Sequence, residues 1–210
     1  MAKAAQLAAL NAAAIAGDVA TAKRYFEALR LRDPRTMRTM VWNTMLKAHA
    51  IAGDLGGATE HFHEMQAQRV RINGRTFGKL IRAAAEAAKP EQAVWLLQHQ
   101  RAAGLEVDMV SYTSVASAFA KAGRPVEAEA FLLEAGAEGL VLDSVAMGAL
   151  SAGFAKLGCA EKAQHWLEEM VRQGLEVSSD SFGAVAASPC KPKSGFERCV
   201  GVNWSPRRQH

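Results

Sequence analysis

Apolar residues recur along the chain at the three- and four-residue spacing that is typical of helices. Between residues 109 and 143, one such stretch covers about 110–121 and a second covers about 126–137. Positions spaced in this way lie on one face of a helix. Gly123 suits the left-handed turn that ends a helix, and Pro125 suits the first turn of the next one. The pattern predicts two helices joined by a tight turn.

The same two-helix pattern repeats every 35 residues. An aromatic residue or methionine recurs at Trp42, Phe77, Tyr112, Met147 and Phe182. A small residue, expected where two helix backbones approach closely, recurs at Ala58, Ala93, Ala128 and Ala163. The turn glycine recurs at Gly53, Gly123 and Gly158, and Ala88 takes its place once. Since a repeat of this kind buries its apolar faces against its neighbours, the period predicts stacked helical hairpins.

The period divides the chain into consecutive units. The full repeats are 39–73, 74–108, 109–143 and 144–178, preceded by a divergent first repeat at 3–38. A further repeat begins at 179–187 and is truncated, and the remaining 188–210 is expected to be a disordered basic tail because no helical period survives there.

Composition and charge refine this picture. Half of the 210 residues are apolar, and aromatic residues make up 7%, which favours a helical core over a sheet. Residues 1–105 carry 15 basic and 8 acidic side chains, whereas residues 106–187 carry 5 basic and 12 acidic ones. A polyanion would therefore prefer the N-terminal half of the chain.

Three short segments resemble the signature of one family. They are Trp42-Asn43-Thr44-Met45-Leu46 at a unit start, Lys121-Ala122-Gly123-Arg124 at a turn, and Gly104-Leu105-Glu106-Val107-Asp108 at a unit end. Together with the 35-residue period, they make the chain similar to a pentatricopeptide repeat (PPR) protein, most clearly over 39–178. Tetratricopeptide repeats, the nearest rival, have 34-residue units and a different aromatic pattern. The resemblance implies an all-α fold, a right-handed α-solenoid of stacked helix-turn-helix repeats.

The resemblance also implies a function, the sequence-specific binding of single-stranded RNA with one base read per repeat. The base-reading pairs would be Asn43 with Asn73, Gly78 with Asp108, Thr113 with Asp143, and Gly148 with Ser178. In the family, Thr with Asp favours guanine, and Asn with Asn favours a pyrimidine, mainly cytosine. The two glycines have no side chain with which to read, so their repeats depart from the pattern.

Two further groups of residues complete the implied site. The base-clamping position, three residues before each first reader, holds Met40, Arg75, Val110 and Val145. Cations placed to contact phosphate are Lys79, Arg82, Lys121 and Lys156. The residues also allow plainer interpretations. Asp108 and Asp143 could be N-caps of the following helices, and the basic face of 74–108 could be a solvated helix surface.

No motif for catalysis, a cofactor or a metal is present. The chain lacks the H-x-E and C-x-x-C ligands of a cytidine deaminase, a P-loop and a nucleophile elbow. We therefore expect a non-enzymatic, monomeric RNA binder, with other RNA-processing proteins as further partners and no membrane association. A helical-repeat scaffold for protein–protein interaction, without RNA binding, is the alternative function.

The resemblance implies work in a mitochondrion or chloroplast, in RNA processing, stability, editing or translation. The repeat pattern starts near Lys3 with no transit peptide ahead of it, so we expect the chain to be a fragment.

Overall fold

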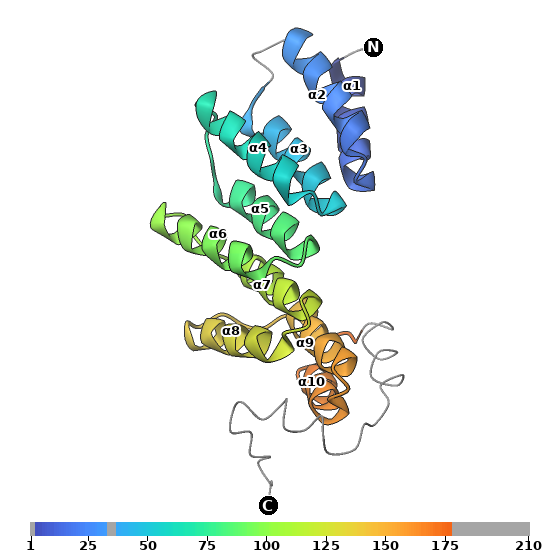
Figure 1. The fold of residues 1–210 in the computed structure, drawn as a ribbon, viewed down its shortest axis with the longest axis vertical. Helices are drawn as coiled ribbons and strands as arrows, with labels where there is room; N and C mark the ends of the chain where they lie inside the picture. Colours follow the sequence, from blue (N-terminus) through green and yellow to red (C-terminus); the bar gives the residue numbers. More distant parts are fainter. Residues whose placement is uncertain (1–2, 33–36, 178–210) are drawn as a thin grey trace, which may run out of the picture. The chain divides into compact units, whose positions relative to one another are not determined.

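The computed structural model describes residues 3–32 and 37–177, and every regular element in these ranges is an α-helix (Figure 1). The helices are α1 (Lys3–Ala16), α2 (Val19–Arg32), α3 (Thr39–Ala52), α4 (Leu55–Ala67), α5 (Gly74–Glu86), α6 (Pro90–Ala102), α7 (Met109–Lys121), α8 (Pro125–Ala137), α9 (Ser144–Lys156) and α10 (Ala160–Arg172). The helices predicted at 110–121 and 126–137 are confirmed as α7 and α8. None of the helices in the described ranges has the length and apolar character needed to cross a membrane.

The chain divides into two compact units, Met1–Ala118 and Phe119–His210, and the division falls inside α7. In the first unit, α3 packs against α1 on one side and α5 on the other, and α6 packs against α5. In the second unit, α9 packs against both α8 and α10. α3 and α9 therefore pack against helices of neighbouring hairpins, which cover their apolar faces.

Two aromatic residues enclose a histidine in the core of the first unit. Phe26 meets Trp42 edge to face, with ring centroids 4.9 Å apart. The His61 ring lies 5.0 Å from Phe26 and 4.9 Å from Trp42, and all three side chains are buried. The low polarity of this surrounding lowers the pKa of His61 to about 4, because burial penalises the charged imidazolium and the nearby His49 adds to the effect.

The alanine column predicted at the helix contacts is fully buried. Ala58, Ala93, Ala128 and Ala163 have no exposed surface, and neither does Ala22 at the same position in the first hairpin. In the second unit, Gly153 of α9 lies so close to α8 that an added Cβ would come within 2.9 Å of the Pro125 Cβ. Small side chains at these points let the helix backbones approach one another.

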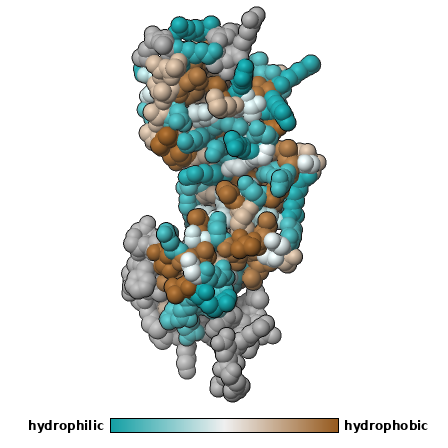
Figure 2. Space-filling model, turned by 180° about the vertical axis from the view of Figure 1, so that it is seen from behind, coloured by the Kyte–Doolittle hydropathy of each residue, from teal (hydrophilic) through white to brown (hydrophobic). Residues whose placement is uncertain are grey.

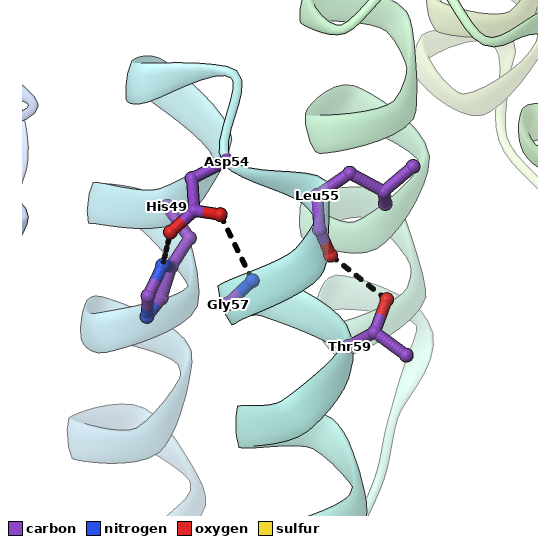
Figure 3. A network of polar contacts seen from close by, with 5 residues as sticks. All are labelled: His49, Asp54, Leu55, Gly57 and Thr59. Atoms are coloured by element: carbon purple, nitrogen blue, oxygen red, sulfur yellow. Dashed lines mark hydrogen bonds and ion pairs between the residues drawn. The ribbon is translucent and has the colours of Figure 1, made fainter.

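Several helices begin with a side-chain cap, and the start of α4 shows how closely such a cap can be packed. The Asp54 carboxylate accepts a hydrogen bond of 2.9 Å from the Gly57 backbone N–H, and its other oxygen lies 2.8 Å from the His49 ring (Figure 3). This N–H bond lowers the pKa of Asp54. A Cβ at Gly57 would collide with both the Asp54 carboxylate and the His49 ring, so this junction requires glycine.

A left-handed residue follows each helix whose next residues the structure describes. The turn glycines predicted by the repeat, Gly53, Gly123 and Gly158, have φ of 66°, 75° and 75°. Ala88, in the same place after α5, is also left-handed with a φ of 51°. Its backbone N–H donates to the Ala85 carbonyl, and the Lys89 N–H donates to the Ala84 carbonyl, as in a Schellman cap. The cap therefore imposes a positive φ on Ala88, and this conformation is strained for a residue that has a Cβ.

We expect Ala88→Gly to raise the free energy of unfolding by about 0.5 to 1 kcal/mol, because glycine removes the strain of the positive φ. The adjacent Ala87 is the matched control, since its φ is −76° and glycine there adds only backbone entropy to the unfolded chain. Urea denaturation of the two variants should give opposite signs. A lower urea midpoint for Ala88→Gly than for the wild type would show that Ala88 is not strained.

Candidate nucleic-acid interface

Near the start of α3, α5, α7 and α9, one exposed residue is followed directly by a buried one. The residues predicted to clamp bases, Met40, Val110 and Val145, expose 68%, 63% and 65% of their surface, and Arg75 is exposed at the same repeat position. Two residues further along each helix, the aromatic or methionine is buried; these residues are Trp42, Phe77, Tyr112 and Met147. Since positions i and i+2 point to nearly opposite sides of a helix, the repeat places one side chain in the core and one in solvent.

The structure brings together the first predicted base-reading pair. The Asn43 Nδ2 donates to the Asn73 Oδ1 at 3.4 Å, and the Thr76 hydroxyl lies 3.0 Å from the Asn43 Oδ1 and 3.2 Å from the Asn73 Oδ1. Asn73 also accepts a 3.1 Å bond from the Thr76 backbone N–H, while its own N–H donates to the Thr76 hydroxyl. This capping box fixes the side chain of Asn73 at the start of α5.

Two other predicted readers also cap helices. The Asp108 carboxylate accepts bonds of 3.0 Å and 2.8 Å from the backbone and hydroxyl of Ser111 at the start of α7. In the second unit, Asp143 accepts a 2.7 Å bond from the Ala146 N–H at the start of α9. The N-cap interpretation of both residues is therefore confirmed. A carboxylate has further lone pairs, so capping leaves capacity for a second partner.

The remaining readers differ in accessibility. Thr113 of α7 is buried in the first unit. Gly78 of α5 is half-buried, and a Cβ built there would meet nothing within 4 Å. Gly148 of α9 is half-buried in the second unit. Ser178, together with the truncated repeat and the basic tail, lies outside the described residues.

The cations predicted to contact phosphate lie on first helices. Lys79 is half-buried and Arg82 is exposed on α5, while Lys121 and Lys156 are exposed at the last residues of α7 and α9. Burial lowers the pKa of Lys79, and the positive charges of Arg82, Lys47 and Arg75 lower it further.

Sequence reasoning missed one member of this group. Lys47 of α3 is half-buried and close enough to affect the titration of Lys79. The 35-residue period could have identified it, because Lys47 lies 35 residues before Arg82 and thus occupies the same repeat position.

The surface around these helices is mixed in character. On the face drawn in Figure 2, hydrophobic residues stand in small groups between hydrophilic ones. Isolated apolar side chains are normal on protein surfaces and need no explanation singly. The exposed residues Met40, Arg75, Val110 and Val145, predicted to clamp bases, differ from such isolated side chains because they recur every 35 residues.

Family models and solved structures agree with this architecture. The PPR repeat model matches residues 40–70, 110–140 and 145–175. Among solved structures, the pentatricopeptide repeat protein PPR10 in complex with an 18-nt psaJ RNA element is 24% identical, with a TM-score of 0.73 over 88% of this chain. A structure of PPR10 from maize gives a TM-score of 0.67 over 92% of this chain at 24% identity.

A further neighbour is a PPR domain, and this chain covers nearly the whole length of that domain. The PPR domain of Arabidopsis thaliana protein-only RNase P 1, in complex with tRNA, is 20% identical with a TM-score of 0.63, over 84% of this chain and 93% of that domain. By contrast, the chain spans 26% of the PPR10 chain in the RNA complex and 27% of maize PPR10. No curated protein matches it in sequence.

These likenesses define an all-α helical-repeat protein of the α-solenoid class, as the sequence predicted. Within that class, the chain contains pentatricopeptide repeats at the three matched segments, and it resembles PPR proteins in fold.

Proposed function

We propose that the chain binds single-stranded RNA and reads one base per repeat, as part of organellar RNA processing, stability, editing or translation. The observation that carries the proposal is the series of exposed clamping residues at Met40, Arg75, Val110 and Val145, each on a first helix. Apolar side chains and the planar guanidinium can press on a base, since every base has a π-face. The PPR10 structure with an 18-nt RNA element and the RNase P 1 structure with tRNA support RNA as the ligand.

The Asn43–Asn73 pair is the best-defined reader in the first unit. Each amide offers both a donor and an acceptor, and cytosine presents both on its Watson–Crick edge, an N4 amino donor and an N3 acceptor. The bond between the two amides is long at 3.4 Å, so a base edge can compete for these groups. The capping box holds Asn73 in place before RNA arrives, which reduces the entropy lost on binding.

We expect Asn73→Asp to move the preference at one base from cytosine towards uracil. An ionised aspartate at this position only accepts, so it suits the N3–H of uracil and repels the bare N3 of cytosine. The change in discrimination should be about 1 to 3 kcal/mol, as for other base-edge contacts. Aspartate also caps helices well, so α5 should keep its start. The measurement is the affinity for four RNAs that differ only at the aligned base.

The matched control is Gln68→Glu, which adds the same charge at an exposed residue after α4. Gln68→Glu should weaken the binding of all four RNAs equally and leave the ratios of their affinities unchanged. If the ratios also stayed constant for Asn73→Asp, Asn73 would be a helix cap only. If no RNA bound at any salt concentration while a peptide did, the chain would be a protein-interaction scaffold instead.

A further inference from the structure

Four cations form a cluster on two neighbouring first helices of the first unit. Arg75, Lys79 and Arg82 follow one another on α5 at spacings of four and three residues, which places them on one helix face. Lys47 of the adjacent α3 completes the group, which we call the α3–α5 basic cluster.

The cluster carries uncompensated positive charge. None of its four members forms an ion pair with an acidic side chain in the part of the chain that the structure describes. Lys79 is half-buried, and its pKa is lowered by burial and by each of the other three cations. Like charges held this close destabilise the free protein, so the arrangement suits an anionic ligand.

An open patch of backbone lies within the cluster. Gly78 sits between Arg75 and Lys79 and one turn before Arg82, and a Cβ there would meet nothing within 4 Å. Any larger side chain would project into this space. The glycine therefore leaves room for a ligand to approach α5 closely, at the place where three cationic side chains begin.

We propose that the α3–α5 basic cluster, with the open surface over Gly78, is a binding site for a phosphate group of the RNA backbone. The repeat 74–108 then anchors the RNA and discriminates the base beside it less than a complete pair would, because Gly78 has no side chain and Asp108 alone of its reading pair can contact a base. The inference rests on the proposed function, because that function supplies the RNA whose phosphate is bound. It explains two features together: the cations form no ion pairs with acidic residues within the described ranges, and Gly78 has no side chain at a base-reading position.

The first test compares a triple variant, Arg75→Gln, Lys79→Gln and Arg82→Gln, with a control triple variant, Lys23→Gln, Arg69→Gln and Lys89→Gln. The control removes the same charge from exposed residues of the first unit that lie on α2, after α4 and before α6. For a single strand, each lost phosphate contact lowers the slope of log affinity against log salt by about 0.7. The cluster variant should lose about two such contacts and bind on the order of 10- to 100-fold more weakly at low salt. Equal slopes for both variants would overturn the site.

The second test locates the contact along the RNA. A single neutral methylphosphonate linkage is moved stepwise through the RNA, and the affinity of the wild-type chain is measured for each. Affinity should fall most at one linkage, and this loss should vanish in the cluster variant because the partner charges are already gone. Changing the base next to that linkage should alter affinity by less than about twofold, since the backbone carries no base information. A profile that is identical in wild type and cluster variant would contradict the proposal.

The third test does not depend on RNA recognition. Inorganic tripolyphosphate should raise the thermal midpoint of the wild type and the control variant but leave that of the cluster variant unchanged. In the absence of any anion, the cluster variant should melt above the wild type, because the mutual repulsion is relieved. An equal rise for all three proteins on adding tripolyphosphate would overturn the site. Absence of RNA binding together with a selective tripolyphosphate effect would refute the proposed function and leave the anion site standing.

Discussion

Replacing Glu129 with alanine is expected to destabilise the second unit by about 3 to 5 kcal/mol, because it leaves a buried lysine without its counter-charge. The Glu129 Oε2 accepts a 2.5 Å bond from the Lys162 Nζ, and the Oε1 accepts a 3.0 Å bond from the Trp166 Nε1. The side chains of Lys162 and Glu129 are only 9% and 12% exposed. The same ammonium lies 4.8 Å from the centre of the Phe154 ring.

The matched control is Glu127→Ala on the same helix. Glu127 pairs with Arg124 at 2.5 Å, but the two side chains are 51% and 38% exposed, so its loss should change stability by at most about 1 kcal/mol. Hydrogen exchange of the α9 and α10 amides measures the opening of this unit. The double variant Glu129→Leu with Lys162→Met should recover most of the loss, since apolar residues can replace a buried ion pair. Similar effects of Glu127→Ala and Glu129→Ala would contradict a buried pair.

Acid should destabilise the first unit through His61. Its pKa is lowered to about 4 in the folded chain, mainly by burial, against about 6.5 when unfolded. Between these values the unfolded chain binds more protons, so the free energy of unfolding falls as the pH falls from about 6.5 to 4. The stability is fully present above a pH of about 6.5, and we expect about 2 to 3 kcal/mol to be lost by a pH of about 4.5.

Charged and polar groups around His61 also shift its pKa, and two variants test whether His61 itself is the titrating group. His49 and Arg30 lower its pKa further, whereas Glu64 and the backbone of Trp42 raise it. His61→Phe keeps an aromatic ring in the core and should flatten the dependence of stability on pH between about 7 and 4.5. The exposed His63→Gln should leave that dependence as in the wild type. An unchanged slope in His61→Phe would show that His61 is not the group responsible.

The helices and their ends could be predicted from local chemistry. Gly123 and Pro125 identify a turn because of backbone preferences that need no tertiary contact, and the structure confirms both. The 35-residue period then extends the prediction to other repeats. Even the strained turn at Ala88 follows from its register with the glycines.

The interactions that decide burial and charge could not be predicted in the same way. Glu129 and Lys162 are 33 residues apart, and nothing local to either indicates that the pair is buried. His61 lies in an aromatic core formed by helices α2 and α3 as well as its own, so its lowered pKa depends on packing between hairpins. The base-reading positions were placed by resemblance, and their role remains a prediction for the readers that the structure describes.

Selection from a pool of short random RNAs at several salt concentrations tests the central claim most directly. RNA binding through successive repeats predicts an enriched motif with a pyrimidine, mainly cytosine, at the base read by Asn43 and Asn73. Beside it, at the base aligned with Gly78, the motif should show a weaker preference than at the Asn43–Asn73 base, and affinity should fall with rising salt. Binding with no base preference at any position, or no binding to RNA at low salt, would contradict the account.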